Sequence, residues 1–242
     1  MKTFKICLMF LLVACGLASG YAQTADDIIN KHITAIGGKD VIGKINSFTT
    51  EATMQVMGND APNSVTVVNG KGYKSESDFN GQKIIQCVTD KGGWMINPMA
   101  GAADPTPIPA DQLKSLKEQL NIGAPFLNYA ANGYKAELLG QEKVGTVNAY
   151  KLKLTSKDSV ETTYYIDPDT YYLIKSVRHG NMMGQDVEIT ISFSNFKKTD
   201  IGYVIPFTID TDFGGQFQLS ATIKKIEFNV PVDPKIFDMP AK

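Results

Sequence analysis

The second half of the chain alternates apolar and polar residues with a period of two. The clearest stretches are residues 150–154, 187–193 and 217–223. A period of two places the apolar side chains on one face of a strand and the polar ones on the other, which is typical of an antiparallel sheet with one dry face. The pattern therefore predicts a mainly β fold with helices, of the α+β class, built on a strongly curved antiparallel sheet.

Further strand-like runs lie on both sides of a break in the middle of the chain. Asn80-Gly81, between two of these runs, is a strong hairpin signal, and Asp167-Pro168-Asp169 is typical of a turn. The predicted strands cover residues 48–57, 64–69, 73–79, 83–89 and 93–97 before the break, and 134–141, 147–155, 161–166, 172–179, 186–196, 203–212 and 216–229 after it.

A helix is predicted near the start of this region. Thr24 and Asp27 have the spacing of a capping box, and Gly37-Gly38 is a typical helix end. Between them, apolar residues recur at helical spacing, namely Ile28, Ile29, Ile33 and Ile36. A short second helix is predicted over residues 40–44.

The break itself contains a loop and a second kind of helix. Residues 98–109 are predicted to be a loop, because Pro105, Pro107 and Pro109 cannot donate to a strand ladder. Residues 110–120 then form an amphipathic pattern with one apolar stripe, made of Leu113, Leu116 and Leu120. This helix is either a lid over the concave face of the sheet or an ordinary part of the core.

The N-terminal segment has the order of charged, apolar and small residues that is typical of a secretory signal. Lys2 and Lys5 precede an apolar run, and Gly20-Tyr21-Ala22 supplies the small residues that a signal peptidase needs. Residues 1–22 are therefore predicted to be a signal peptide, cleaved after Ala22, and residues 23–242 a single domain. In the alternative reading, Leu12-Val13-Ala14-Cys15 is a lipoprotein signal and Cys15 becomes the acylated first residue.

Charge and cysteine content exclude several classes of partner. The formal net charge is −1, and loss of the signal peptide removes two lysines and no acidic residue, which leaves −3. A nearly neutral chain with intermixed signs does not indicate nucleic-acid binding or electrostatic attachment to anionic lipid. Cys87 is then the only cysteine, so no internal disulfide forms, and its setting predicts a buried strand residue.

The sequence contains no constellation typical of catalysis. His32 is expected on the surface of the first helix and His179 in a hairpin, and neither has the spacing of a metal-ligand set. Asp167 and Asp169 belong to a turn rather than to an acid–base pair. We therefore expect no enzyme activity, no metal and no cofactor.

Apolar and sulfur-containing residues are the positive evidence for binding. The flexible thioethers of Met54, Met57, Met95 and Met99 suit a surface that accepts more than one ligand shape, although ordinary core packing is the favoured explanation for any single one of them. Met182 and Met183, at the tip of a Gly-flanked hairpin, are expected to contact a membrane or a partner. The residues predicted to line an apolar concavity are Met54, Val56, Trp94, Ile96, Leu113, Leu116, Leu120, Leu152, Leu154, Ile189, Ile191, Phe193, Phe217 and Leu219.

The order of these elements, with the segments 164–168, 193–197 and 231–237, resembles the outer-membrane lipoprotein-sorting proteins, relatives of the periplasmic lipoprotein carrier. The resemblance covers nearly the whole of residues 23–242. It implies an unclosed antiparallel half-barrel wrapped around helices, a periplasmic location, and a ligand with lipid or lipoprotein acyl chains.

The resemblance also implies inner- or outer-membrane partner proteins. One departure from the family is that the sequence does not identify the inward arginine with which the best-known carriers hold their closed state, since Arg178 is the only arginine. The alternative function is an envelope interaction or scaffold module whose sheet is filled by its own side chains.

Overall fold

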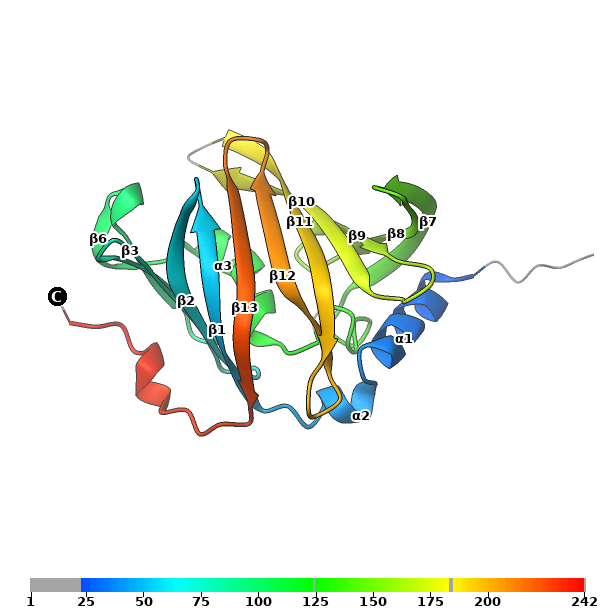
Figure 1. The fold of residues 1–242 in the computed structure, drawn as a ribbon, viewed down its shortest axis with the longest axis horizontal. Helices are drawn as coiled ribbons and strands as arrows, with labels where there is room; N and C mark the ends of the chain where they lie inside the picture. The colour runs from blue at the N-terminus through cyan, green and yellow to red at the C-terminus, as the bar shows by residue number, and fades with distance from the viewer. Residues whose placement is uncertain (1–22, 124, 183–184, 242) are drawn as a thin grey trace, which may run out of the picture.

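The computed structural model describes residues 23–123, 125–182 and 185–241, so the predicted signal peptide and Met183 lie outside the described residues. The described residues form one antiparallel sheet of thirteen strands in the order β6-β5-β4-β3-β2-β1-β13-β12-β11-β10-β9-β8-β7 (Figure 1). Strands β6 and β7 lie at opposite edges and do not pair with each other, so the sheet stays open. The predicted fold class, an unclosed and curved antiparallel half-barrel with helices, is confirmed.

The strands are long and most connections between them are tight turns. Their bounds are β1 Ser47–Val56, β2 Asn59–Val68, β3 Gly72–Phe79, β4 Gln82–Thr89, β5 Gly93–Asn97, β6 Ala102–Pro107, β7 Lys135–Val144, β8 Val147–Thr155, β9 Glu161–Ile166, β10 Leu173–Met182, β11 Gln185–Lys198, β12 Val204–Phe213 and β13 Gln218–Phe228. The helices are α1 Ala25–Ala35, α2 Lys39–Ile42 and α3 Ala110–Leu116, with 3₁₀ turns η1 Pro98–Ala100, η2 Lys117–Leu120 and η3 Pro234–Phe237.

Helix α1 begins and ends as its sequence predicts. The Thr24 side chain accepts a hydrogen bond from the Asp27 amide, and the Asp27 carboxylate accepts one from the Thr24 amide, which completes the capping box. At the other end Gly37 has a φ of +125°, and a Cβ there would lie 2.8 Å from the Gly202 carbonyl oxygen. Glycine therefore lets the chain turn closely against the loop before β12.

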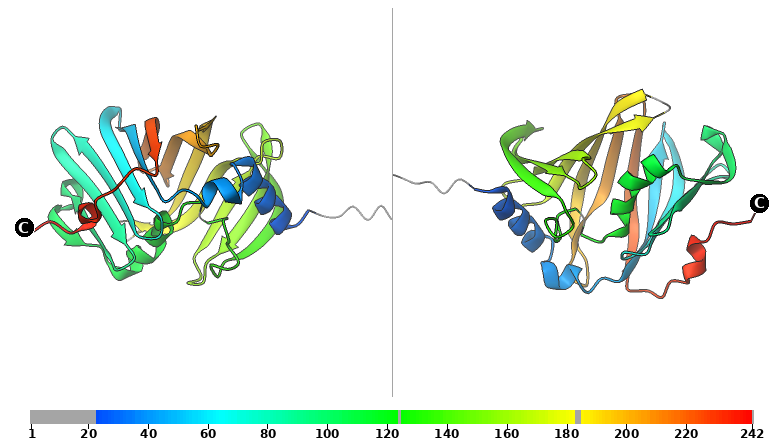
Figure 2. Two further views of the ribbon diagram at one scale, coloured as in Figure 1. Left: turned by 90° about the horizontal axis from the view of Figure 1, so that it is seen from below. Right: turned by 180° about the vertical axis from the view of Figure 1, so that it is seen from behind.

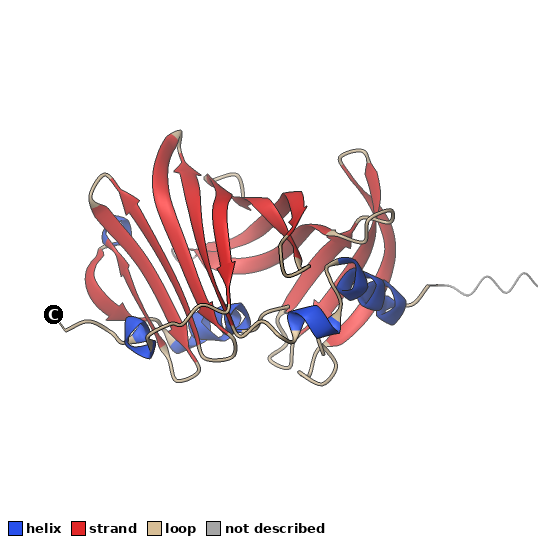
Figure 3. Ribbon diagram, turned by 60° about the horizontal axis from the view of Figure 1, so that its bottom comes forward, coloured by secondary structure: helices blue, strands red, loops and turns tan. Residues whose placement is uncertain are grey.

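The sheet has an inner face, covered by α1 and by α3 with η2, and an outer face (Figure 2). The main core lies on the inner face, where α1 packs over β8 and β9, and it includes Ile28, Ile29, Ile33, Leu152, Leu154 and Ile166. A second inner cluster joins Val88 and Ile108 to Leu120 of η2. Figure 3 shows the strands as one strongly curved layer. Helices therefore fill the two arms of the half-barrel.

An apolar cluster lies on the outer face, and the C-terminal segment covers it. Ile85, Cys87 and Trp94 are buried there with Phe237 of η3 packed on them. The Trp94 indole Nε1 donates to the Phe237 carbonyl oxygen at 2.9 Å. Cys87 is buried in β4, as predicted.

The prediction of a loop over residues 98–109 is wrong in part, because Ala102–Pro107 form strand β6. Trp94 pairs with Pro107 and Met95 pairs with Thr106. The strand tolerates its prolines because it lies at the edge of the sheet, where one side of the backbone needs no partner. Its edge position could not be seen in the sequence.

The prediction that His32 lies on the surface is also wrong. The His32 ring is only 6% exposed, and Nδ1 lies 2.8 Å from the Tyr171 carbonyl oxygen. Its ring packs edge-on against Phe126, which comes from the segment between η2 and β7. The buried face of α1 is therefore wider than its isoleucine pattern indicated, because it includes His32.

Candidate functional site

An apolar strip runs across the inner face between the two covered arms. Ile191 pairs with Thr211, Thr211 with Leu219, and Leu219 with Val56, so one row crosses four strands. Val56 shares its face with Phe48, which packs against the main core, because side chains of β1 alternate. The strip, named here the inner strip, comprises Met54, Val56, Ile189, Ile191, Phe193, Ile209, Phe213, Leu219, Ala221 and Ile223.

The side chains of the inner strip are not covered by the described helices. Ile189 is buried, whereas the other members are partly exposed. Within the described part of the chain, none of them belongs to the three hydrophobic clusters under α1, under η2 and under η3. The centre of the inner face is therefore a partly exposed apolar surface flanked by two filled arms.

Six of the predicted lining residues meet on this strip, and the others do not. Leu152 and Leu154 are 0% and 1% exposed in the main core under α1. Phe217 stacks on Phe213 in the turn between β12 and β13. The six residues that share the strip are Met54, Val56, Ile189, Ile191, Phe193 and Leu219.

Trp94 and Ile96 lie on the opposite side of the sheet from the strip. Alternation along β5 places both on the outer face, with Phe237 packed against their cluster. The sequence shows that two side chains share a face of one strand, but it does not show which face is the inner one.

The apolar stripe of α3 and η2 faces the inner side of the sheet. Leu113 and Leu116 pack against the cluster of Val88 and Ile108, and Leu120 is buried within it. These side chains cover Tyr73 of β3, Val88 of β4 and Met95 of β5, and none of the three contributes to the inner strip. Four strip residues were not predicted, namely Ile209, Phe213, Ala221 and Ile223. They lie in or next to the predicted strands over residues 203–212 and 216–229, whose alternation of apolar and polar residues could have identified them.

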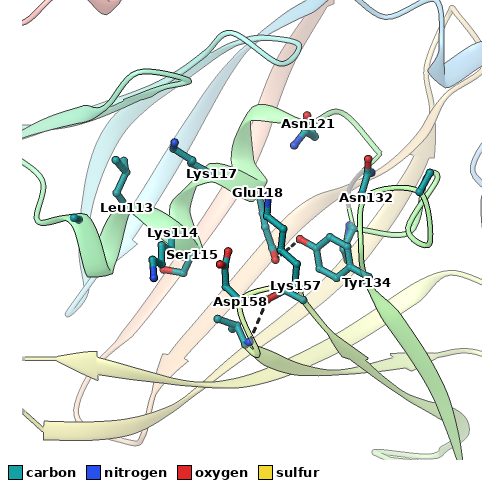
Figure 4. A pocket seen from close by; sticks show the side chains of 15 residues that line it. Leu113, Lys114, Ser115, Lys117, Glu118, Asn121, Asn132, Tyr134, Lys157 and Asp158 are labelled. Carbon is teal, nitrogen blue, oxygen red and sulfur yellow. Dashed lines mark hydrogen bonds between the residues drawn. The ribbon is translucent and has the colours of Figure 1, made fainter.

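A pocket of about 720 Å³ lies between α3 with η2 and the turn that joins β8 to β9 (Figure 4). Its wall is mixed in polarity, with Lys114, Lys117 and Lys157 near Glu118 and Asp158. Of the predicted lining residues, Leu113 alone is among those that form its wall in the described structure. No residue of the inner strip is among those that form this wall, so the pocket and the strip are separate features of the described structure.

A hydrogen bond crosses the wall of this pocket. The Tyr134 hydroxyl donates to Glu118 Oε1 at 2.6 Å. Burial raises the pKa of Tyr134, and the neighbouring Glu118 carboxylate raises it further. The Tyr134 hydroxyl therefore stays protonated near neutral pH, and the bond ties η2 to the segment before β7.

Neither histidine has the partners of a catalytic base in the described structure. His32 contacts a backbone carbonyl, and His179 Nδ1 lies 3.4 Å from Asp186 Oδ2 with both side chains exposed. The Asp167 carboxylate accepts bonds from the amides of Asp169 and Thr170, which confirms the predicted turn. Burial raises the pKa of Cys87 to about 11, so its thiol stays protonated.

The described residues contain no group of three or more His, Cys, Asp or Glu side chains placed to hold a metal ion. No helix within them is both long and apolar enough to cross a membrane.

Two exposed methionines, Met57 and Met99, lie at the same end of the strands. Met57, in the turn after β1, is 80% exposed, and Met99, in η1 after β5, is 63% exposed. Met182 ends β10 at the same end of the sheet, because these strands run in the same direction (Figure 1). The contact predicted for Met182 and Met183 stays a prediction.

Several solved structures share the fold of this chain. A putative outer membrane lipoprotein-sorting protein domain from Vibrio parahaemolyticus is 14% identical, with a TM-score of 0.55 over 88% of this chain and 95% of that one. A LolA superfamily protein from Nitrosomonas europaea is 16% identical, with a TM-score of 0.57 over 90% and 98%. A DUF1329 family protein from Desulfovibrio piger is 13% identical, with a TM-score of 0.59 over 90% and 98%.

The chain therefore has the fold of lipoprotein-sorting and LolA superfamily proteins, as the resemblance in its sequence implied. No protein-family model matches the sequence, and no curated protein matches it either. At these identities the likeness establishes the fold and not the ligand.

Proposed function

We propose that this protein binds or carries a molecule with acyl chains, such as a lipid or lipoprotein, on the inner strip. The observation that supports this most directly is the partly exposed apolar surface of β11, β12, β13 and β1 between two arms filled by their own side chains. A surface of this kind, on the concave side of a sheet, is a natural site for an apolar ligand.

The expected affinity suits a carrier. Burial of about eight methylenes at roughly 0.8 kcal/mol each gives about 6 kcal/mol, which corresponds to a dissociation constant of tens of micromolar. One chain is then released easily, whereas several chains bound together are held more firmly. Such a site needs shape and apolar lining, so it requires no metal, cofactor or catalytic group.

The proposed location is the periplasm. The export signal predicted over residues 1–22 and the fold shared with lipoprotein-sorting proteins support it. Acylation at Cys15 is the alternative, in which the same domain is tethered to a membrane. Partner proteins in the inner or outer membrane would then supply or receive the ligand.

The test compares two changes on one strand. Ile191→Asp places a carboxylate on the inner strip, and Thr190→Asp places one on the outer face beside it. Binding of a fluorescent fatty acid to the intact protein is expected to fall at least tenfold with Ile191→Asp and to stay unchanged with Thr190→Asp. Native mass spectrometry of protein from the cell envelope should show bound lipid. Bare protein that takes up no fatty acid would contradict the proposal.

The second candidate is an interaction or scaffold module with a filled sheet. The complete burial of Leu152 and Leu154 under α1 favours it for that arm of the half-barrel. It predicts that Ile191→Asp destabilises the fold and that the unchanged protein binds no apolar probe.

A further inference from the structure

We propose that Arg178 binds an anionic head group, a carboxylate or a phosphate, of an amphiphile whose chain lies along the inner strip. This inference rests on the proposed function and adds a chemical class of ligand to it.

The strand register places Arg178 on the inner face. Arg178 pairs with Thr162 of β9, and Thr162 pairs with Leu154 of β8, whose side chain is buried in the inner core. On its other side Arg178 pairs with Ile189 of β11, a member of the inner strip. Residues directly opposite each other in antiparallel strands share a face, so the guanidinium lies beside the apolar strip.

Arg178 has no carboxylate partner within the described residues. The six ion pairs of the described structure involve other groups, and no hydrogen bond of its side chain accompanies them. The buried ring of Tyr164 is close enough to interact electrostatically with the guanidinium, but a neutral phenol leaves the positive charge uncompensated. Glu118, which also lies near Tyr164, accepts the Tyr134 hydroxyl instead.

The cations of this arm that do form ion pairs with carboxylates lie on the outer face. Lys151 contacts Glu142, and Lys153 contacts Glu137 and Glu161. These lysines alternate with Leu152 and Leu154 along β8, so they point away from the inner core. Arg178 is therefore an uncompensated cation of the inner face beside apolar residues, which is the arrangement that an anionic amphiphile complements.

The geometry fits an amphiphile of ordinary length. From β10, where Arg178 lies, to β13, where Leu219 lies, the sheet spans three strand spacings, or about 14 Å. The row of Ile189 and Phe213 leads directly away from Arg178 across this distance. A guanidinium offers a planar fork of donors that matches both carboxylate and phosphate oxygens.

The experiment measures how well four probes displace an uncharged naphthylamine dye from the intact protein at slightly alkaline pH. The probes are dodecanoate, dodecyl phosphate, dodecanol and methyl dodecanoate, which share one chain and differ in head charge. The variants are Arg178→Met and Arg178→Lys, with Lys175→Met on the outer face of the same strand as the control. Lys175 lies over the Tyr165 ring, away from the strip.

We expect at least one anionic probe to displace the dye about tenfold better than the neutral probes do. Arg178→Met should abolish this preference without weakening the displacement of the dye by dodecanol. Arg178→Lys should retain part of the preference, and Lys175→Met should leave it unchanged. If the Arg178-dependent displacement is stronger with dodecanoate, the ligand class is a free fatty acid. If it is stronger with dodecyl phosphate, the ligand class is a lipid with a phosphate head group.

Equal displacement by charged and neutral probes, or a preference that survives in Arg178→Met, overturns the assignment to Arg178 while the apolar site stands. Failure of the dye and of every probe to bind overturns the proposed function as well. If Arg178→Met does not fold, as judged by circular dichroism, the comparison of the four probes on the unchanged protein and on Arg178→Lys still decides the question.

Discussion

Burial by residues distant in sequence determines the protonation state of the His32 ring. Desolvation lowers the pKa of its ring below the ordinary value of 6.5, and the hydrogen bond to the Tyr171 carbonyl opposes this in part. The neutral ring, with Nδ1–H as donor, is thus the form that the folded protein prefers. The pattern of isoleucines in α1 could not show this, because the cover over His32 comes from Phe126 and Tyr171, which are distant in sequence.

This lowered pKa predicts a loss of stability in mild acid. Below about pH 6.5 the unfolded chain binds a proton at His32 that the folded protein does not bind until the lowered pKa is reached. The free energy of unfolding should fall over this window by up to roughly 1.4 kcal/mol per pH unit, a loss that His32→Gln removes. Urea unfolding at several pH values measures it, with the exposed His179→Gln as control. An identical pH dependence in His32→Gln would contradict the prediction.

Two leucines on the inner face should respond differently to truncation. Leu152 is completely buried, so Leu152→Ala leaves a cavity and should cost about 2–5 kcal/mol of unfolding free energy. Leu219, on the inner strip, is partly exposed, so Leu219→Ala should cost about 1 kcal/mol or less. Chemical denaturation compares the two variants. Equal large costs would mean that the strip is a filled core.

At the scale of elements, the helix α3 with η2 is neither a free lid nor wholly core. Leu120 is buried against Val88 and Ile108, whereas Leu113 and Leu116 are partly exposed on the same cluster. The Gly93 position shows how close this contact is, since a Cβ there would lie 3.0 Å from Leu113. The end of the segment is therefore anchored and its start is held less firmly.

Leu116→Asp is expected to loosen α3 without unfolding the sheet. A carboxylate against an apolar wall costs several kcal/mol, which the short helix avoids by moving away from β4 and β5. Binding of an apolar dye should rise while circular dichroism still reports strands. Cooperative unfolding of the whole domain would show instead that the helix is core. Unchanged dye binding and stability would mean that Leu116 does not contribute to the cover.

The C-terminal segment acts as a strap on the outer face, and Gly72 permits its contact. A Cβ at Gly72 would lie 2.7 Å from the Phe237 ring. Gly72→Ala should therefore displace η3, break the hydrogen bond from Trp94 to Phe237, and shift the emission of Trp94, the only tryptophan, to longer wavelength. Phe237→Ala removes the clash, so adding Gly72→Ala to it should cause no further shift. A further shift would contradict the role of Phe237.

At the scale of the whole molecule, the sequence predicted which residues alternate along each strand. It did not predict which strand faces share one side of the sheet, or which of them a helix covers. Residues 150–154 and 187–193 both became strands, yet Leu152 lies under α1 whereas Ile191 lies on the uncovered strip. Trp94 and Ile96 lie on the outer face, and the sequence could not show this, because the face on which a side chain lies depends on pairing between distant strands. Strand β6 was missed because its edge position depends on the complete strand order.

An open half-barrel with an uncovered apolar strip should gain stability when the strip is occupied. A ligand that binds only the folded protein stabilises it by about 2.7 kcal/mol at a hundredfold excess over its dissociation constant. For a domain of this size that corresponds to a rise in Tm of roughly 5–10 °C. Thermal unfolding followed by circular dichroism, with and without dodecanoate, measures the shift. Thr190→Asp should keep the shift and Ile191→Asp should lose it, because only the latter places a charge on the strip. A shift that persists in Ile191→Asp would locate the ligand elsewhere, with the pocket beside α3 as the next site to test.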